Sequence, residues 1–358
     1  MNTSLKASCQ YDLSFPYHHE ETAIERLTAI QSYMQTQQFD NELLGDGQAI
    51  SKLEEKVAAL LGKPAAMWCP TGTMAQAIAA RIHASKQNSN RLLLHPTSHL
   101  LLHESDSYKL AHGLNAKTIG QWQQPITASM LEAGAACAFI ELPQRHNGGL
   151  LPTWDELSTL KLKAAELQLP LHMDGARLWS CLSHYETRSF AEISDGFDSI
   201  YVSLYKDIGA LGGALLIGQS DFIDEARIWR HRLGGLLIQP WPLINDALRL
   251  LDKRLEQMPT FITRAKQLSV LLTPLVSIKV QPQIPHTNML HIHLPCSAKV
   301  AEAARDDVAR TTGAWLSNRF WSYENNDKCA LELIVGEKAL EIPDSTFLTA
   351  VSTLVHSI

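Results

Sequence analysis

A carboxylate and a lysine each stand at the end of an apolar, strand-like segment of this sequence. Asp174 follows residues 170–173, and Lys206 follows residues 199–205. Pyridoxal 5′-phosphate chemistry needs such a pair, because a carboxylate holds the pyridine nitrogen protonated and an amine forms a Schiff base. The two residues therefore predict a pyridoxal-phosphate enzyme.

Each residue of the pair also has an ordinary structural interpretation. An aspartate after a strand often caps a helix, and a lysine at a strand end often reaches solvent. However, ligands of open α/β sheets bind beyond the carboxyl ends of strands, where Asp174 is expected. A lysine after a continuous apolar run is costly unless it is paired or covalently used. Downstream of Lys206, Gly209, Gly212 and Gly213 let the backbone pass close to a ligand, which favours the functional interpretation.

The turn Thr71-Gly72-Thr73 lies between a strand-like segment at 65–69 and a helical pattern. The first N–H groups of a helix and its positive end attract phosphate, and the hydroxyl of Thr73 adds a donor. Threonine is also a common helix cap, so the turn alone decides little. Its position upstream of Asp174 and Lys206 makes it a candidate phosphate site.

The composition is that of an ordinary globular protein and excludes several classes. The chain has 358 residues, 45% hydrophobic and 19% charged, and can bury a large core. A formal net charge of −6 without basic clusters predicts neither nucleic-acid nor membrane binding. No segment has the length of a signal peptide core or a membrane span. The six cysteines form no CxxC pair, which predicts reduced thiols and a cytoplasmic protein.

Helical and strand-like patterns alternate from about Ile50 to Gly218. Strands are expected at residues 65–69, 91–94, 137–141, 170–173, 199–204 and 213–218, the last a candidate antiparallel strand. Helices are expected at residues 53–61, after the Thr71–Thr73 turn, and at 154–167 with Thr153 as the N-cap. This alternation predicts an α/β fold with helices on both faces of a mostly parallel sheet.

The pattern changes after about Trp241. Helices are expected at residues 243–272 and 298–311, and short strands at residues 278–280, 289–294 and 330–335. We therefore expect a large cofactor-binding domain at 45–245 and a small α+β domain at 246–358. Residues 1–44 are expected to pack with the small domain or with a partner subunit.

Four segments together resemble the threonine aldolase/aromatic amino-acid β-eliminating lyase family. They are PTGTMAQ at 70–76, TSHLLLHE at 97–104, HMDGAR at 172–177 and SLYK at 203–206. The text LEEKVAALLGKPAAMWCPTGTMA, which begins at Leu53, is also close to the family's pattern. The resemblance covers about residues 45–235. It implies pyridoxal 5′-phosphate as cofactor and the aminotransferase-like architecture of fold type I, with a mostly parallel seven-stranded sheet between helices.

The resemblance implies five cofactor-binding positions. Lys206 would be the Schiff-base lysine, and Asp174 the partner of the pyridine nitrogen. Gly72 and Thr73 would hold the phosphate, and His99 would stack on the cofactor ring.

The resemblance also implies a substrate and the residues that meet it. Arg177 would bind the α-carboxylate, for which a bidentate guanidinium is suited. His146 would lie near the substrate's β-hydroxyl, and either His99 or His146 would remove the hydroxyl proton. The reaction would cleave the Cα–Cβ bond of a β-hydroxy-α-amino acid and release glycine and an aldehyde. The enzymes of this family imply a homodimer or homotetramer.

Two further features near these motifs are given structural or non-metal interpretations. His95, His99 and His103 have a four-residue spacing that imitates a metal-binding helix face, but Pro96 interrupts that helix, so no metal is expected. His172 is expected to pack or hydrogen-bond behind the site.

The sequence departs from the family where the substrate would be bound. It has no Arg-Ser-Asp-Thr segment near its start, and Glu332 stands where the family has a second carboxylate-binding arginine. A glutamate there would repel a carboxylate. Ile238 replaces an arginine that reaches a neighbouring subunit's phosphate, and Tyr205 replaces a serine. Two alternatives therefore stay open: β-elimination or racemisation on another amino acid, and a degenerate homologue that binds the cofactor without turnover.

Overall fold

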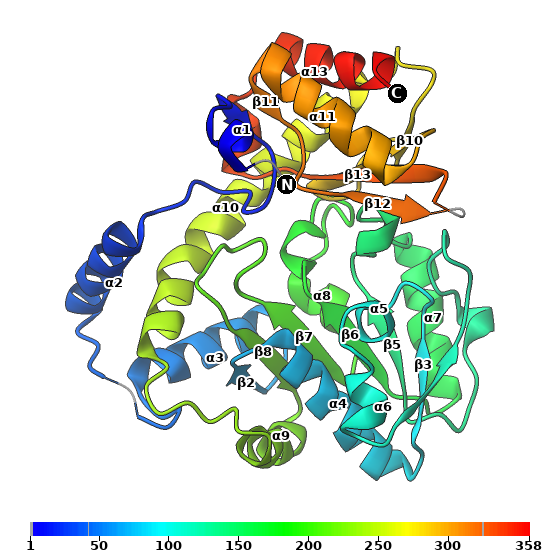
Figure 1. The fold of residues 1–358 in the computed structure, drawn as a ribbon. Helices are drawn as coiled ribbons and strands as arrows, with labels where there is room; N and C mark the ends of the chain where they lie inside the picture. Colours follow the sequence, from blue (N-terminus) through cyan, green and yellow to red (C-terminus); the bar gives the residue numbers. More distant parts are fainter. Residues whose placement is uncertain (1–2, 42, 324–325) are drawn as a thin grey trace. The chain divides into compact units, whose positions relative to one another are not determined.

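The computed structural model describes residues 3–41, 43–323 and 326–358, and its contacts divide the chain into two compact units (Figure 1). The larger unit comprises Glu21–Gln144 and Leu151–Leu255, and the smaller unit comprises Met1–Glu20, Arg145–Leu150 and Glu256–Ile358. These bounds differ from the expected 45–245 and 246–358. The boundary falls inside one continuous helix, α10 (Trp241–Leu271), where no change of composition marks it.

The larger unit contains a seven-stranded sheet with the strand order β2-β8-β7-β6-β5-β3-β4. All neighbouring pairs are parallel except those of β8, which is antiparallel to β2 and β7. The expected mostly parallel sheet and its antiparallel member are confirmed. The strands are β2 (Ala65–Cys69), β3 (Arg91–Leu94), β4 (Asn115–Thr118), β5 (Cys137–Glu141), β6 (Leu171–Gly175), β7 (Ser199–Ser203) and β8 (Ala214–Gly218).

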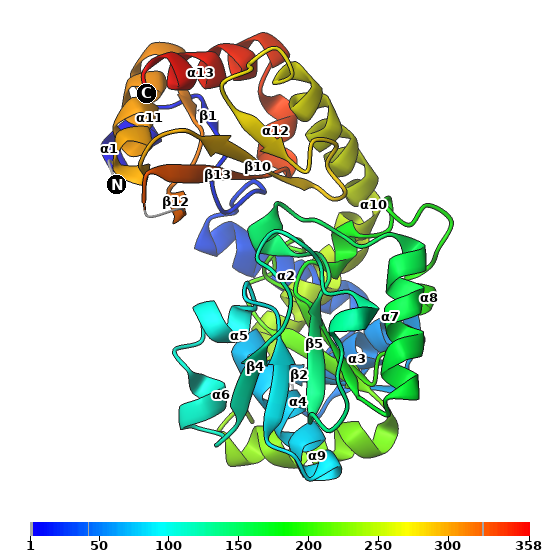
Figure 2. The same ribbon diagram turned by 90° about the vertical axis from the view of Figure 1, so that its right-hand side faces the viewer.

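Helices cover both faces of this sheet. Figure 2 shows α4 and α6 on one side of the strands and α3, α7 and α8 on the other. The hydroxyl of Thr153 accepts a hydrogen bond from the Glu156 N–H, so the expected N-cap of α7 is confirmed. The helices of the larger unit besides α10 are α2 (Ala23–Gln37), α3 (Gln48–Leu60), α4 (Gly72–Gln87), α5 (His99–Leu102), α6 (Ser107–Leu110), α7 (Trp154–Glu166), α8 (Phe190–Ser194) and α9 (Ser220–Arg232).

The smaller unit contains an antiparallel four-stranded sheet with the order β12-β13-β10-β9. Both ribbon views place helices α11 and α13 together on one face of it (Figures 1 and 2). A short parallel pair, β1 with β11, joins the N-terminal segment to this unit. The elements are α1 (Thr3–Ala7), β1 (Tyr11–Asp12), β9 (Lys279–Gln281), β10 (Met289–Leu294), α11 (Ala298–Thr312), β11 (Ala314–Trp315), β12 (Phe320–Tyr323), β13 (Lys328–Ile334), α12 (Glu337–Glu341) and α13 (Asp344–His356).

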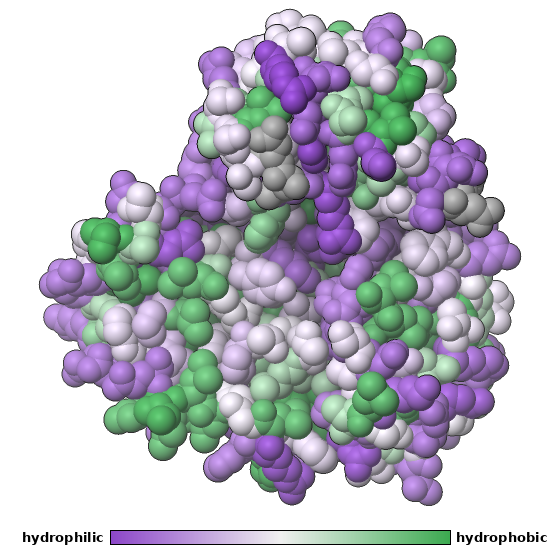
Figure 3. Space-filling view, viewed as in Figure 1, coloured by the Kyte–Doolittle hydropathy of each residue, from purple (hydrophilic) through white to green (hydrophobic). Residues whose placement is uncertain are grey.

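The surface mixes hydrophilic and apolar areas, as Figure 3 shows for one face of the molecule. Three exposed apolar side chains of the larger unit, Leu43, Leu44 and Ile238, form what we call the Leu44 patch. The Leu44 N–H donates a hydrogen bond to the carbonyl of Ile238 over 2.9 Å, which holds the two segments together.

Within the described part of the chain, no helix has the length and apolar character needed to cross a membrane.

Candidate functional site

A pocket of about 330 Å³ opens in the larger unit at the start of α4. Its walls come from four segments that are distant in the sequence: the turn and first residues of α4, the α5 region, the end of β7, and the glycine-containing loop before β8. The candidate residues Gly72, Thr73 and His99 line it, together with Tyr201 and Tyr205. The structure therefore brings three of the expected cofactor residues to one cavity.

The start of α4 is shaped for an anionic group. The hydroxyl of Thr71 caps the helix by accepting from the Met74 N–H at 3.2 Å. The N–H groups of Gly72 and Thr73 occupy the first two helical positions, which have no partner within a helix. A Cβ atom on Gly72 would lie 2.1 Å from the hydroxyl oxygen of Tyr201, so only glycine fits there. The helix start can thus bind a phosphate through backbone groups.

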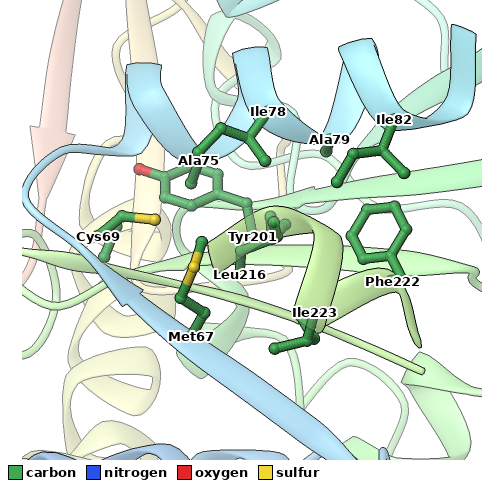
Figure 4. Packing of buried hydrophobic residues seen from close by; sticks show 12 residues of the cluster. Met67, Cys69, Ala75, Ile78, Ala79, Ile82, Tyr201, Leu216, Phe222 and Ile223 are labelled. Carbon is green, nitrogen blue, oxygen red and sulfur yellow. The ribbon is translucent and has the colours of Figure 1, made fainter. Parts of the chain in front are cut away.

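Tyr201 connects the helix start to the strand ends. Figure 4 shows its ring beneath α4, beside Ala75, with the hydroxyl directed toward the beginning of that helix. It belongs to an apolar cluster in which α4 and α9 pack on the sheet, with Ile78 and Phe222 among its members. Burial, followed by the charge of Asp174, raises the pKa of Tyr201 well above its ordinary range, so the phenol stays neutral.

Asp174 lies at the carboxyl end of β6, next to Tyr201 in the register of β6 and β7. Its side chain is buried, and its Oδ1 accepts a hydrogen bond from the Ala176 N–H at 3.2 Å. Asp174 and Tyr201 point to the same face of the sheet as α4, because paired residues of neighbouring strands share a face. The carboxylate is therefore on the pocket's side of the sheet.

Lys206 follows β7 and is half-buried. Its ammonium lies 5.9 Å from the ring centre of Tyr201 and 5.7 Å from that of Tyr205, and both tyrosines line the pocket. The backbone N–H of Lys206 donates a hydrogen bond to the Ser203 hydroxyl over 3.4 Å. The next residue, Asp207, is buried, and burial raises the pKa of its carboxyl to about 6, although the charges of Arg177 and Lys206 act to lower it.

His99 is held by a buried carboxylate that the sequence motifs did not single out. The Nδ1 atom of His99 lies 2.9 Å from Oε1 of Glu104, which also lines the pocket. Arg177, the candidate carboxylate-binding residue, is buried in the same unit, near enough to Asp207 and Tyr201 to act on their pKa values. The glutamate lay within the quoted TSHLLLHE motif, and its place after the histidine was the available signal.

His172 hydrogen-bonds behind the site, as expected. Its Nδ1 lies 2.7 Å from the hydroxyl oxygen of Ser199, and Nε2 of His83 lies 2.7 Å from the same oxygen. The serine hydroxyl can donate to one ring and accept from the other, so both contacts can form while both rings are neutral. Burial lowers the pKa of His83 to about 3 and the pKa of His172 well below its ordinary range.

His146 belongs to the smaller unit, in the segment Arg145–Leu150. Its ring meets that of Trp321 edge-on, with the centroids 5.4 Å apart. Gly148 has φ +68, and a Cβ there would lie 2.1 Å from the carbonyl oxygen of Gln281, so the glycine lets this segment approach strand β9.

Glu332 also lies in the smaller unit and forms a bidentate ion pair. Nε of Arg145 donates to Oε2 of Glu332 at 2.7 Å, and Nη2 donates to Oε1 at 2.8 Å. The repulsion expected of Glu332 is therefore offset by a guanidinium from another segment. Arg319 adds a second guanidinium, 3.4 Å from the ring centre of Trp321.

Among the histidines with four-residue spacing, His95 makes hydrogen bonds within the fold. Nδ1 of His95 contacts the Thr97 hydroxyl at 2.6 Å, and its Nε2 lies within hydrogen-bonding distance of two backbone carbonyls. In the described residues, no group of three or more histidine, cysteine, aspartate or glutamate side chains is arranged to hold a metal ion.

A sequence model of the family described as β-eliminating lyase matches residues 24–295, which is more than half of the chain. The chain belongs to the β-eliminating lyase family. Members of this family are pyridoxal-phosphate-dependent lyases, so the chain is a lyase of that kind, and the donors at the start of α4 and the carboxylate of Asp174 fit the phosphate and the pyridine nitrogen.

Known relatives extend this result to nearly the whole chain. A candidate L-allo-threonine aldolase from Listeria monocytogenes has a structure with 33% identity and a TM-score of 0.90, and the match covers 99% of both chains. Low-specificity L-threonine aldolase 1 of Arabidopsis thaliana is 24% identical over 302 residues, 80% of this chain and 84% of that protein. A threonine aldolase from Leishmania major shares the fold, with a TM-score of 0.74 and 18% identity. The expected fold type I is confirmed, and the similarity reaches well beyond residues 45–235.

Proposed function

We propose that this lyase cleaves the Cα–Cβ bond of β-hydroxy-α-amino acids, in the manner of a threonine aldolase, and releases glycine and an aldehyde. The relatives named for threonine or allo-threonine support the reaction. The observation that carries the proposal is the pocket of the larger unit, where the start of α4, His99 and Tyr201 meet beside the buried carboxylate of Asp174.

The residues of the larger unit divide the work of holding the cofactor. The backbone N–H groups of Gly72 and Thr73 would bind its phosphate, and Lys206 would be the residue that holds it covalently through its aldehyde group. Asp174 would keep a proton on the pyridine nitrogen, which its buried carboxylate favours. His99 would stack on the ring. When bound, the cofactor supplies an electron sink for the electrons of the broken bond.

The substrate needs two further groups. Arg177 binds the α-carboxylate, since a guanidinium offers two parallel donors to it. A base must take the proton of the β-hydroxyl so that the Cα–Cβ bond can break. His99 and His146 are the candidates for that base.

The test is aldehyde release from a panel of amino acids. Purified protein with added pyridoxal phosphate is incubated with threonine, allo-threonine and phenylserine, and aldehyde, pyruvate and ammonia are measured. We expect aldehyde and glycine in equal amounts. In Lys206→Ala both products should be lost, and the visible absorption band of the lysine-bound cofactor should be lost as well. Pyruvate or a 2-oxo acid with ammonia would instead indicate elimination. Binding without any product would indicate the degenerate homologue, and either result overturns the aldolase proposal.

Two wider properties belong to the same proposal. The Leu44 patch exposes three apolar side chains on the larger unit, and a second copy of the chain would cover it in a homodimer or homotetramer. All six cysteines are free thiols, which fits the reducing environment of the cytoplasm.

A further inference from the structure

Glu104 is a buried carboxylate in the wall of the pocket. Its side chain is 1% exposed, whereas that of His99 is 30% exposed. Burying a carboxylate is costly unless hydrogen-bond donors surround it. Glu104 is therefore expected to impose an arrangement on the groups that contact it.

Three side chains, each from a different helix, surround this carboxylate. Oε1 of Glu104 lies 2.9 Å from Nδ1 of His99 and accepts from Nε2 of Gln76 at 3.4 Å, and its Oε2 accepts from the Ser107 hydroxyl at 3.4 Å. Gln76 is buried one turn beyond the start of α4. An ionised carboxylate only accepts hydrogen bonds, so each neighbour must present a proton to it.

This requirement fixes the proton on the ring of His99. A neutral imidazole has one nitrogen that donates and one that accepts. Since Nδ1 faces the carboxylate, Nδ1 carries the proton, and Nε2 keeps its lone pair. His99 lines the pocket and is partly exposed, so the ring retains access to a ligand there.

We infer that Glu104 is a positioning residue that holds His99 with its proton on Nδ1, so that Nε2 is the atom that accepts the β-hydroxyl proton. The role of Nε2 as the proton acceptor rests on the proposed function, whereas the position of the proton on Nδ1 does not. The inference selects His99 over His146 as the base. A carboxylate that fixes the tautomer of a histidine contributes strongly to other reactions with a histidine base.

The first measurement uses the cofactor-free protein and no activity. Nitrogen NMR of protein labelled with ¹⁵N-histidine distinguishes the two tautomers at alkaline pH, where the ring is neutral, and His99→Asn assigns the signal. We expect the Nδ1–H form in the unchanged protein. Glu104→Met removes the acceptor and should shift the ring toward the Nε2–H form, whereas Glu104→Gln retains an oxygen that can accept from Nδ1 and should preserve it.

The matched control is Glu54→Met, because Glu54 is another buried carboxylate of the larger unit, bound to the Trp68 N–H and to Arg227, outside the pocket. It should leave the His99 tautomer unchanged. An Nε2–H form in the unchanged protein would overturn the inference, and that measurement needs no variant of Glu104 to fold. A Glu104→Met protein that folds and keeps the Nδ1–H form would overturn it as well.

The second measurement is the rate of the loaded enzyme. Glu104→Met should lower kcat by roughly 10²- to 10⁴-fold with a much smaller change in KM, and Glu104→Gln should recover part of the loss. Equal losses in both variants would indicate a purely structural role. If the tautomer is as expected and no amino acid gives aldehyde, the proposed function fails while the positioning of His99 by Glu104 stands.

Discussion

Acid should destabilise the larger unit through the two buried histidines behind the candidate site. Burial holds the pKa of His83 at about 3 and the pKa of His172 well below its ordinary range. Both rings are therefore neutral in the folded protein near pH 5, whereas an unfolded chain protonates histidine below about pH 6.5. Because the folded pKa values are depressed, this stabilisation is complete above pH 6.5 and is lost as the pH falls toward 3.

The size of the effect follows from the number of protons. A difference of one bound proton changes the unfolding free energy by about 1.4 kcal/mol per pH unit, so the pair gives a slope of about 2.7 kcal/mol per unit between roughly pH 6 and 4. When the pH falls from 7.5 to 5, each histidine lowers the unfolding free energy by about 2 kcal/mol, and the pair lowers it by about 4 kcal/mol. This is a large share of the stability of a typical domain, roughly 5–15 kcal/mol. The loss would affect β6 and β7, the strands that carry Asp174 and Tyr201.

Urea unfolding of the cofactor-free protein between pH 5 and 7.5, followed by circular dichroism, measures this slope. His83→Gln and His172→Asn keep a hydrogen-bonding group near the ring nitrogen that meets Ser199. Each variant should reduce the slope by about one proton, and the double variant by about two. His231→Gln, at an exposed position of the same unit, is the matched control and should not change the slope. Equal slopes in the unchanged protein and the double variant would refute the reasoning.

Two further substitutions test the geometry around the pocket. Gly72→Ala would place a Cβ 2.1 Å from the Tyr201 hydroxyl, so we expect the unfolding free energy, measured by heat or urea, to fall by about 1–3 kcal/mol, and the binding of inorganic phosphate to weaken. The control is Gly212→Ala, whose Cβ would lie 3.5 Å from Leu243 and which should leave the stability nearly unchanged. Asp207 has a raised pKa of about 6, so its charged form costs stability as the pH rises from about 4 to 6 and the cost is constant above that. Asp207→Asn should therefore gain up to about 3 kcal/mol relative to the unchanged protein at pH 7 and almost nothing at pH 4, and a pH-independent difference would contradict the cause given for the shift.

The core strands of the larger unit could be predicted because their residues are apolar on both faces. The segments at 65–69, 91–94 and 137–141 coincide with β2, β3 and β5, since strands that are buried on both faces are continuous apolar runs with turn residues at their ends. Strand β4 (Asn115–Thr118) was missed because it is a polar, mostly exposed edge strand. The pair β1 and β11 could not be predicted, since each strand has two residues and their partners lie far apart in the chain.

Some residues of the candidate site could likewise be predicted from the sequence, and others could not. The candidates Asp174 and Gly72 could be predicted because one ends a buried strand and the other follows one, and the fold brings the carboxyl ends of β6 and β2 to the same region. Glu104 was not singled out, because its contact with His99 depends on the path of the short helices α5 and α6 rather than on a periodic pattern. Tyr201 was hidden within an apolar run, although its spacing of two from Ser199 and Ser203 places all three on one face of β7.

Glu332 shows why a single substitution cannot define the charge of a surface. Taken alone, it replaces a carboxylate-binding arginine with an acid and predicts repulsion. In the structure its charge is paired with that of Arg145, and a second guanidinium, that of Arg319, lies over the ring of Trp321, which Arg145 also contacts. The three charges come from separate segments of the chain, and burial together with the charge of Arg145 lowers the pKa of Arg319, which shows that the guanidinium groups are close enough to interact. The formal charge of this cluster is therefore +1, so a carboxylate approaching the smaller unit here would be attracted rather than repelled.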